Sequence, residues 1–157
     1  MNRSRRNLLQ ASGGTTVMVL AVSAGIFKSG DLFAAEWNKA AFDTKTLQET
    51  VKALGGTVAT ESKDIVFVTA PDIAENGAVV PVAIASKIPM TESIAILVEK
   101  NPNSLSAAFD IPAGTEPFIS TRVKMGQTSN VYALVKADGK YFFATKEIKV
   151  TLGGCGG

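Results

Sequence analysis

The sequence predicts a mainly β protein, an antiparallel β-sandwich preceded by a short N-terminal helix. Short runs rich in valine, isoleucine and phenylalanine recur over about ninety residues, and pairs of turn-forming residues separate them. No helical pattern lies between these runs, so a nucleotide-binding α/β fold, in which strands and helices alternate, is not indicated. The chain has 157 residues, which suits a single domain with a modest core.

The helix is predicted at the start of this domain. Between residues 37 and 54, apolar side chains recur every three or four residues, with a gap at Thr44. Gly55 and Gly56 follow at once, and glycine commonly ends a helix. The apolar positions are Trp37, Ala41, Leu47, Val51 and Leu54.

Six or seven strands are predicted after the helix. The pair Asp138–Gly139 between two apolar runs is a strong hairpin signal. Pro81 cannot donate to a β-ladder, which predicts that its strand is an edge strand or carries a bulge. The last strand is expected to run from Tyr141 to Leu152, directly into the C-terminal glycines. The other runs are residues 65–69, 78–85, 94–99, 118–125 and 131–136, with further turn signals at residues 76–77, 101–103 and 113–114.

The N-terminus has the pattern of a twin-arginine export signal. Arg5 and Arg6 precede a weakly apolar run over residues 11–27. Glycine, serine and threonine interrupt this run, whereas a membrane span needs about 20 strongly apolar residues. We therefore expect residues 1–35 to be cleaved and the protein to lie in the periplasm rather than in a membrane. Because this route carries folded proteins, a partner subunit assembled before export is also expected.

The composition disfavours several classes of function. Without residues 1–35, 12 of the 16 basic and 13 of the 14 acidic residues remain, a net charge of −1 that does not favour nucleic-acid binding. The chain has no histidine and one cysteine, so a metal or iron–sulfur centre is not indicated and an internal disulfide is impossible. We expect neither a cofactor nor a metal.

The single cysteine, Cys155, lies in the C-terminal sequence LGGCGG. Its neighbours Gly153, Gly154, Gly156 and Gly157 have no side chains to pack and predict a flexible, thin arm. Such an arm could enter a narrow channel of another protein and present the thiol there. No basic residue adjoins Cys155, so any activation of the thiol is expected from the receiving enzyme. An idle exposed thiol would be a liability in an oxidising compartment, which favours a functional role.

Together with the export signal and the tail, four stretches resemble the SoxY family, the sulfur-carrier subunits of the bacterial thiosulfate-oxidising (Sox) system. They are PDIAENGAVVPV (residues 71–82), ILVEKNPNS (96–104), RVKMGQTSNVYALVKADGK (122–140) and KEIKVTLGGCGG (146–157). Ser104 departs from the family pattern, in which proline is expected.

The resemblance implies an immunoglobulin-like sandwich and a carrier that is not itself an enzyme. Thiosulfate-derived intermediates would be bound covalently to Cys155 and presented on a swinging arm, residues 153–157, by the domain of residues 36–152. The implied partners are a SoxZ-like β-sandwich subunit in a heterodimer, a haem-containing c-type cytochrome, a sulfate-releasing hydrolase and a sulfane dehydrogenase. A disulfide-type bond suits this role because it holds the cargo yet opens by thiol exchange.

Two alternatives remain at the level of the sequence. A ubiquitin-like carrier would hold sulfur as a thiocarboxylate on Gly157, but it needs ATP-dependent activation and has no use for Cys155. A structural sandwich cross-linked through Cys155 would form a permanent intermolecular disulfide.

Other prominent residues have simpler interpretations: Asn76–Gly77 and Pro71 shape turns. Asp72 and Glu75 are loop charges, and the residues 141–143 belong to a strand core or a partner interface.

Overall fold

The computed structural model describes residues 38–151. Arg5 and Arg6 of the predicted export signal lie outside this range, as do Cys155 and the four glycines of the predicted arm. Within it, no helix is both long and apolar enough to cross a bilayer.

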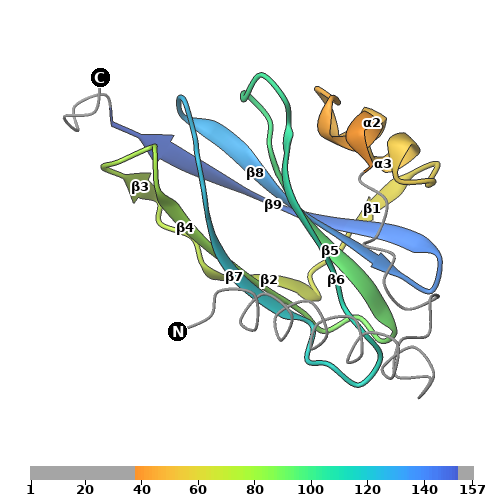
Figure 1. Ribbon diagram of the computed structural model, residues 1–157. Coiled ribbons are helices and arrows are strands. Elements are labelled where there is room, and N and C mark those ends of the chain that lie inside the picture. Colours follow the sequence, from red (N-terminus) through yellow and green to blue (C-terminus); the bar gives the residue numbers. More distant parts are fainter. Residues whose placement is uncertain (1–37, 152–157) are drawn as a thin grey trace, which may run out of the picture. The chain divides into compact units, whose positions relative to one another are not determined.

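The described residues form a β-sandwich of two sheets (Figure 1). The larger sheet has the strand order β1-β9-β8-β5-β6, and β3 also pairs with β9; the smaller sheet has the order β2-β4-β7. The strands of the larger sheet are β1 (Ala59–Glu61), β3 (Ile73–Ala74), β5 (Thr91–Val98), β6 (Leu105–Asp110), β8 (Ser129–Ala137) and β9 (Lys140–Val150). Those of the smaller sheet are β2 (Ile65–Thr69), β4 (Val80–Ser86) and β7 (Phe118–Val123). The predicted mainly β sandwich is confirmed.

The longest strands, β8 and β9, form the predicted hairpin. Ala137 pairs with Lys140, so Asp138 and Gly139 alone form the turn. Both turn residues have positive φ values, 48° and 68°, as a two-residue turn of the primed kind requires. This hairpin directs the 11 residues of β9 toward the C-terminal end of the chain.

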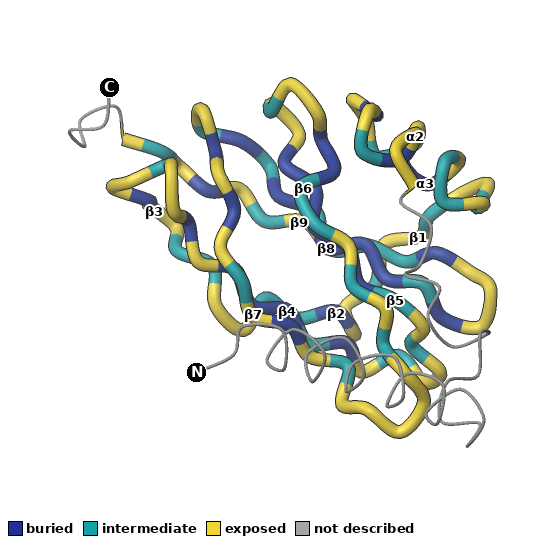
Figure 2. Tube along the Cα trace, viewed as in Figure 1, coloured by how far each residue is buried: buried dark blue, intermediate teal, exposed yellow. Residues whose placement is uncertain are grey.

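The main core lies between the two sheets. Alternate residues of β4, β5, β8 and β9 point inward, and Figure 2 shows the buried segments of these strands facing one another. Ile84, Ile94, Ile96, Val131, Val135 and Ile148 are completely buried there. The sandwich is therefore held by branched aliphatic side chains from both sheets.

A second cluster attaches two short helices to the outer face of the larger sheet. Helix α2 spans Lys39–Phe42 and helix α3 spans Leu47–Ala53. Val51 and Leu134 are buried in this cluster with Tyr141, whose hydroxyl donates to the carbonyl oxygen of Leu54 at 2.6 Å. The sequence predicted helical structure at the right position and its end before Gly55. It predicted one continuous helix, however, and the structure has two. The helix breaks at residues 43–46, where the side chain of Thr46 accepts a hydrogen bond from the backbone of Glu49 and caps a new helix.

The prediction for Pro81 was wrong. Strand β4 is the central strand of the smaller sheet, and the register shift lies in β2, between Phe67 and Thr69. Proline is tolerated because β2 stops pairing at Ala83, so Pro81 has a partner only in β7, Arg122. Further differences are the parallel pairing of β1 and β3 with β9 and the end of β9 at Val150 rather than at Leu152.

Candidate functional site

The end of β9 is the point from which the predicted arm leaves the described domain. Strand β3 lies beside this end of β9 in Figure 1, and Ile73 and Ala74 pair with Lys149 and Val150. The backbone nitrogen of Lys149 donates to the carbonyl oxygen of Asp72 at 3.0 Å. The backbone nitrogen of Thr151 donates to the carbonyl oxygen of Ala74 at 3.1 Å. The backbone is thus hydrogen-bonded up to the last described residue.

The opposite side of this strand end is also held. The backbone nitrogen of Val150 donates to the hydroxyl oxygen of Thr128 at 2.9 Å. Thr128 precedes β8, the strand that pairs with β9 along its whole length. Val150 therefore has partners on both sides, and only residues after Thr151 remain to form an arm.

Gly77 packs tightly against this end of the sandwich. Its carbonyl oxygen accepts a hydrogen bond from the nitrogen of Met125 at 2.7 Å. A Cβ atom at Gly77 would lie 2.8 Å from Cγ1 of Val150 and even closer to the carbonyl oxygen of Met125. The site therefore requires glycine because two backbones approach each other there. Asn76 shapes the turn, since its side-chain oxygen accepts from the nitrogen of Ala78 at 3.0 Å, as its turn prediction requires.

Lys146 connects β9 to the segment before β3. Its Nζ donates to the carbonyl oxygen of Ala70 at 2.6 Å and lies 3.0 Å from a carboxylate oxygen of Asp72. The Asp72 side chain is 91% exposed, so the ion pair itself contributes little, whereas the bond to Ala70 is partly shielded. The interpretation of Asp72 as a loop charge is consistent with this ion pair.

The sequence analysis did not identify Lys146 or Thr128 as anchoring residues. A signal was available for Lys146: the inward positions of β9 are otherwise apolar, namely Phe142, Ala144, Ile148 and Val150. A lysine in such a row needs a specific hydrogen-bond partner. For Thr128 no such signal exists, because its role depends on the register of β8 against β9.

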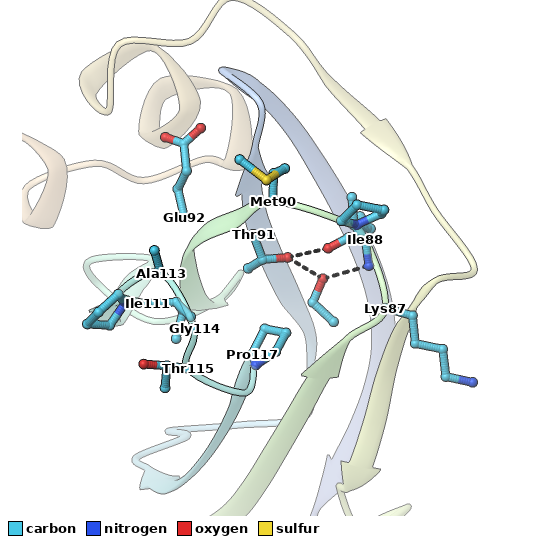
Figure 3. Close-up of a pocket in the computed structure, with 13 residues that line it drawn as sticks. Lys87, Ile88, Met90, Thr91, Glu92, Ile111, Ala113, Gly114, Thr115 and Pro117 are labelled. Carbon is cyan, nitrogen blue, oxygen red and sulfur yellow. Dashed lines mark hydrogen bonds between the residues drawn. The ribbon is translucent and has the colours of Figure 1, made fainter.

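A hollow of about 490 Å³ lies at the other end of the sandwich (Figure 3). Residues 86–92, 111–115 and 117 line it. The Thr91 hydroxyl donates to the carbonyl oxygen of Ile88 at 2.8 Å and shares a hydrogen bond with the Ser86 hydroxyl. Thr91 pairs with Ala137, next to the β8–β9 hairpin. The 11 residues of β9 place that hairpin about 33 Å from Val150. This hollow therefore lies at the opposite end of β9 from Thr151, the last described residue.

The shifted pKa values also belong to residues away from the end of β9. The Lys136 ammonium and the Gly139 backbone N–H hold the pKa of Glu92 below its ordinary value. Burial raises the pKa of Tyr132 and of Tyr141. Among residues 38–151, no three carboxylate, thiol or imidazole groups are arranged to hold a metal ion.

Comparison with known proteins decides the family. The family model described as "Sulfur oxidation protein SoxY" matches residues 51–155, two thirds of the chain. The chain belongs to the SoxY family. The match spans β1 to β9 and continues through Cys155. Membership confirms the resemblance stated from the sequence.

A solved structure of a SoxY protein agrees with this assignment. The sulfur carrier protein SoxY from Chlorobium limicola f thiosulfatophilum is 38% identical, with a TM-score of 0.61 over 68% of this chain and 96% of that chain. A superoxide reductase from Ignicoccus hospitalis is 19% identical, with a TM-score of 0.48 over 59% of this chain and 81% of that chain. The human F-spondin reeler domain is 11% identical, with a TM-score of 0.38 over 59% and 95%. Neither of these two likenesses supports a functional inference. No curated protein matches this chain.

Proposed function

We propose that this SoxY-family protein carries intermediates of sulfur oxidation covalently on Cys155 and does not catalyse their conversion. The observation that carries the proposal is the family match, which extends through Cys155. The anchored end of β9 supports it, because Thr151 is hydrogen-bonded to Ala74 and Val150 to Thr128. Four glycines and one thiol then follow within six residues.

The chemistry requires a separate oxidant. In the proposed loading step, the Cys155 thiol loses its proton and its sulfur bonds to the sulfane sulfur of thiosulfate. Two electrons leave in one-electron steps, each reducing a ferric haem iron of a c-type cytochrome to the ferrous state, and the product is an S–S–SO₃⁻ group on the cysteine. Water then cleaves the terminal sulfur–sulfonate bond on a hydrolase, which releases sulfate and leaves a persulfide for a sulfane dehydrogenase.

The carrier needs no cofactor of its own in this scheme. Glycine makes the arm narrow, so the receiving enzyme can enclose Cys155 and exclude water around the reactive sulfur.

We further propose that residues 1–35 direct export of the folded protein to the periplasm, together with a SoxZ-like subunit. The Arg5–Arg6 pair before an interrupted apolar run supports this part.

Intact-mass spectrometry tests the carrier role. The exported chain is incubated with thiosulfate and a Sox cytochrome, and its mass is measured before and after treatment with dithiothreitol. We expect a gain of one thiosulfate group that dithiothreitol removes, and no gain in Cys155→Ser. A modification that resists the reductant would instead indicate a thiocarboxylate on Gly157. A permanent disulfide dimer with no added sulfur would indicate the structural module.

A further inference from the structure

The turn between β3 and β4 contains the pair Asn76–Gly77, whose sequence favours deamidation. The backbone nitrogen of the residue after an asparagine can attack the side-chain amide carbon, and glycine leaves this nitrogen unhindered because it has no Cβ atom. Asn76 is the only asparagine of the chain that glycine follows. It is exposed, and Gly77 is half-buried. The contacts of the turn determine whether the reaction can proceed in the folded protein.

The attacking group and the leaving group are both free of hydrogen bonds to other described residues. The backbone N–H of Gly77, which would attack, donates to no acceptor within residues 38–151. The side-chain nitrogen of Asn76, Nδ2, would leave, and it has no partner in the same part of the chain. Because Asn76 is exposed, water can reach this nitrogen. No hydrogen bond within the described domain therefore has to break at either group before the reaction.

The side-chain oxygen of Asn76 is, by contrast, already hydrogen-bonded. Oδ1 accepts from the backbone nitrogen of Ala78 at 3.0 Å, which keeps the side chain folded back beside the main chain of the next two residues. Negative charge develops on this oxygen when Cγ is attacked, and a backbone N–H that already points at it stabilises that charge. The turn thus supplies a donor where the reaction needs one.

We propose that Asn76 is a site of spontaneous deamidation in the folded protein. The Gly77 nitrogen bonds to Cγ of Asn76 and loses its proton, the Cγ–Nδ2 bond breaks, and the side-chain nitrogen leaves as ammonia with that proton. Water then opens the resulting cyclic imide. Opening at Cγ gives aspartate, whereas opening at the main-chain carbonyl gives isoaspartate, in which the main chain runs through Cβ and Cγ. Nothing is oxidised or reduced in either step.

Isoaspartate would disturb the contacts that hold the end of β9. It lengthens the main chain directly before Gly77, whose carbonyl oxygen accepts from the nitrogen of Met125 at 2.7 Å. A Cβ atom at Gly77 would already lie 2.8 Å from Cγ1 of Val150, so the main chain has little room to shift there. Aspartate at position 76 keeps the normal main chain, and its carboxylate can still accept from the nitrogen of Ala78. The two products therefore affect the sandwich differently.

Incubation of the exported chain in a mildly alkaline buffer, under conditions in which it stays folded, tests this inference. Peptide mass spectrometry measures the conversion at each asparagine, and labelling by an isoaspartyl methyltransferase identifies isoaspartate. We expect Asn76 to convert at least about tenfold faster than Asn103, which is also exposed but is followed by Ser104, a residue with a Cβ atom. Asn76→Ser should abolish the label in this turn because serine has no side-chain amide.

A folded chain in which Asn76 converts no faster than Asn103 would overturn the inference. The same incubation in urea shows that the assay detects the reaction. If Asn76 converted in urea but stayed intact in the folded chain, the turn would protect the pair instead of allowing the reaction, and the inference would be wrong.

The effect on the end of β9 is measured on the aged chain, separated from the intact one by ion exchange. We expect faster hydrogen exchange at residues 149–151 and a lower unfolding midpoint in the isoaspartate form, and values close to the wild type in Asn76→Asp. Equal behaviour of the isoaspartate form and Asn76→Asp would show that the longer main chain does not disturb this end. Because no thiosulfate or partner is present, both results are independent of the carrier role.

Discussion

The backbone nitrogen of Thr151 donates a hydrogen bond to the carbonyl oxygen of Ala74 over 3.1 Å, at the last position that the structure describes. Ala74 is itself buried at 6% exposure, so the bond ties the C-terminal strand to an ordered part of the sandwich. A carrier benefits from this arrangement because a fixed root limits where the thiol can travel. The proposed arm then searches a small volume, and the effective concentration of cargo at a docked enzyme is high.

Gly77→Ala is predicted to destabilise this end of the sandwich. The added methyl group would meet the carbonyl oxygen of Met125 and Cγ1 of Val150, and the backbone contact cannot yield cheaply. We expect a loss of about 1–3 kcal/mol in the free energy of unfolding, measured by urea denaturation.

Gly126→Ala is the matched control, because a Cβ atom there would meet nothing within 4 Å. Its unfolding free energy should stay within about 0.5 kcal/mol of the wild type. Equal stability of Gly77→Ala and Gly126→Ala would contradict the close approach at Gly77.

Lys146→Met is predicted to loosen the segment before β3. The variant keeps the aliphatic stem but removes the donor to the Ala70 carbonyl oxygen, a charged hydrogen bond of 2.6 Å. We expect a cost of about 1–2 kcal/mol, together with faster hydrogen exchange around residues 70–74.

Asp72→Asn separates the two contacts of Lys146. The Asp72 carboxylate is 91% exposed, so its loss should cost less than about 0.5 kcal/mol. If Asp72→Asn destabilised the protein as much as Lys146→Met, the ion pair rather than the bond to Ala70 would be the stabilising contact.

The sandwich was predictable because its strongest signals are local. Asp138–Gly139 determines a two-residue turn by its own conformational preferences, and the structure has this turn. The long apolar runs of β4, β5, β8 and β9 identify buried strands without knowledge of their partners.

The elements that the sequence analysis missed depend on distant partners. Strands β1 and β3 are three and two residues long, and both pair with β9, about 76–82 residues later. Strand β6 reads LSAAFD, whose small residues have weak β-propensity. The residues that hold the end of β9 are of the same kind: Thr128 meets Val150 only after β8 and β9 have paired. The family identity was predictable because the C-terminal motif is distinctive in itself.

The hairpin end of the sandwich is predicted to lose stability in acid through Glu92. Its carboxylate lies 2.7 Å from Nζ of Lys136 and accepts from the nitrogen of Gly139 at 2.9 Å, which lowers the pKa of Glu92. A folded pKa below the unfolded value gives stabilisation that is present above about pH 4.5 and is lost as the pH falls through the folded pKa. Lys136, the ion-pair partner of Glu92, does not change the pH dependence of stability in this range. Its raised pKa affects stability only above about pH 10.5. Glu92→Gln should therefore lower Tm at pH 7, and its difference from the wild type should shrink below pH 4.

Thermal unfolding between pH 3 and pH 8 measures this difference. Glu116→Gln, at an exposed glutamate outside both ion pairs of the described residues, serves as the control and should show no such trend. Added salt should reduce the effect of Glu92→Gln at pH 7, because the pair is exposed to solvent and is screened. A Tm difference that stayed constant down to pH 3 would mean that Glu92 stabilises the hairpin by packing and not by its charge.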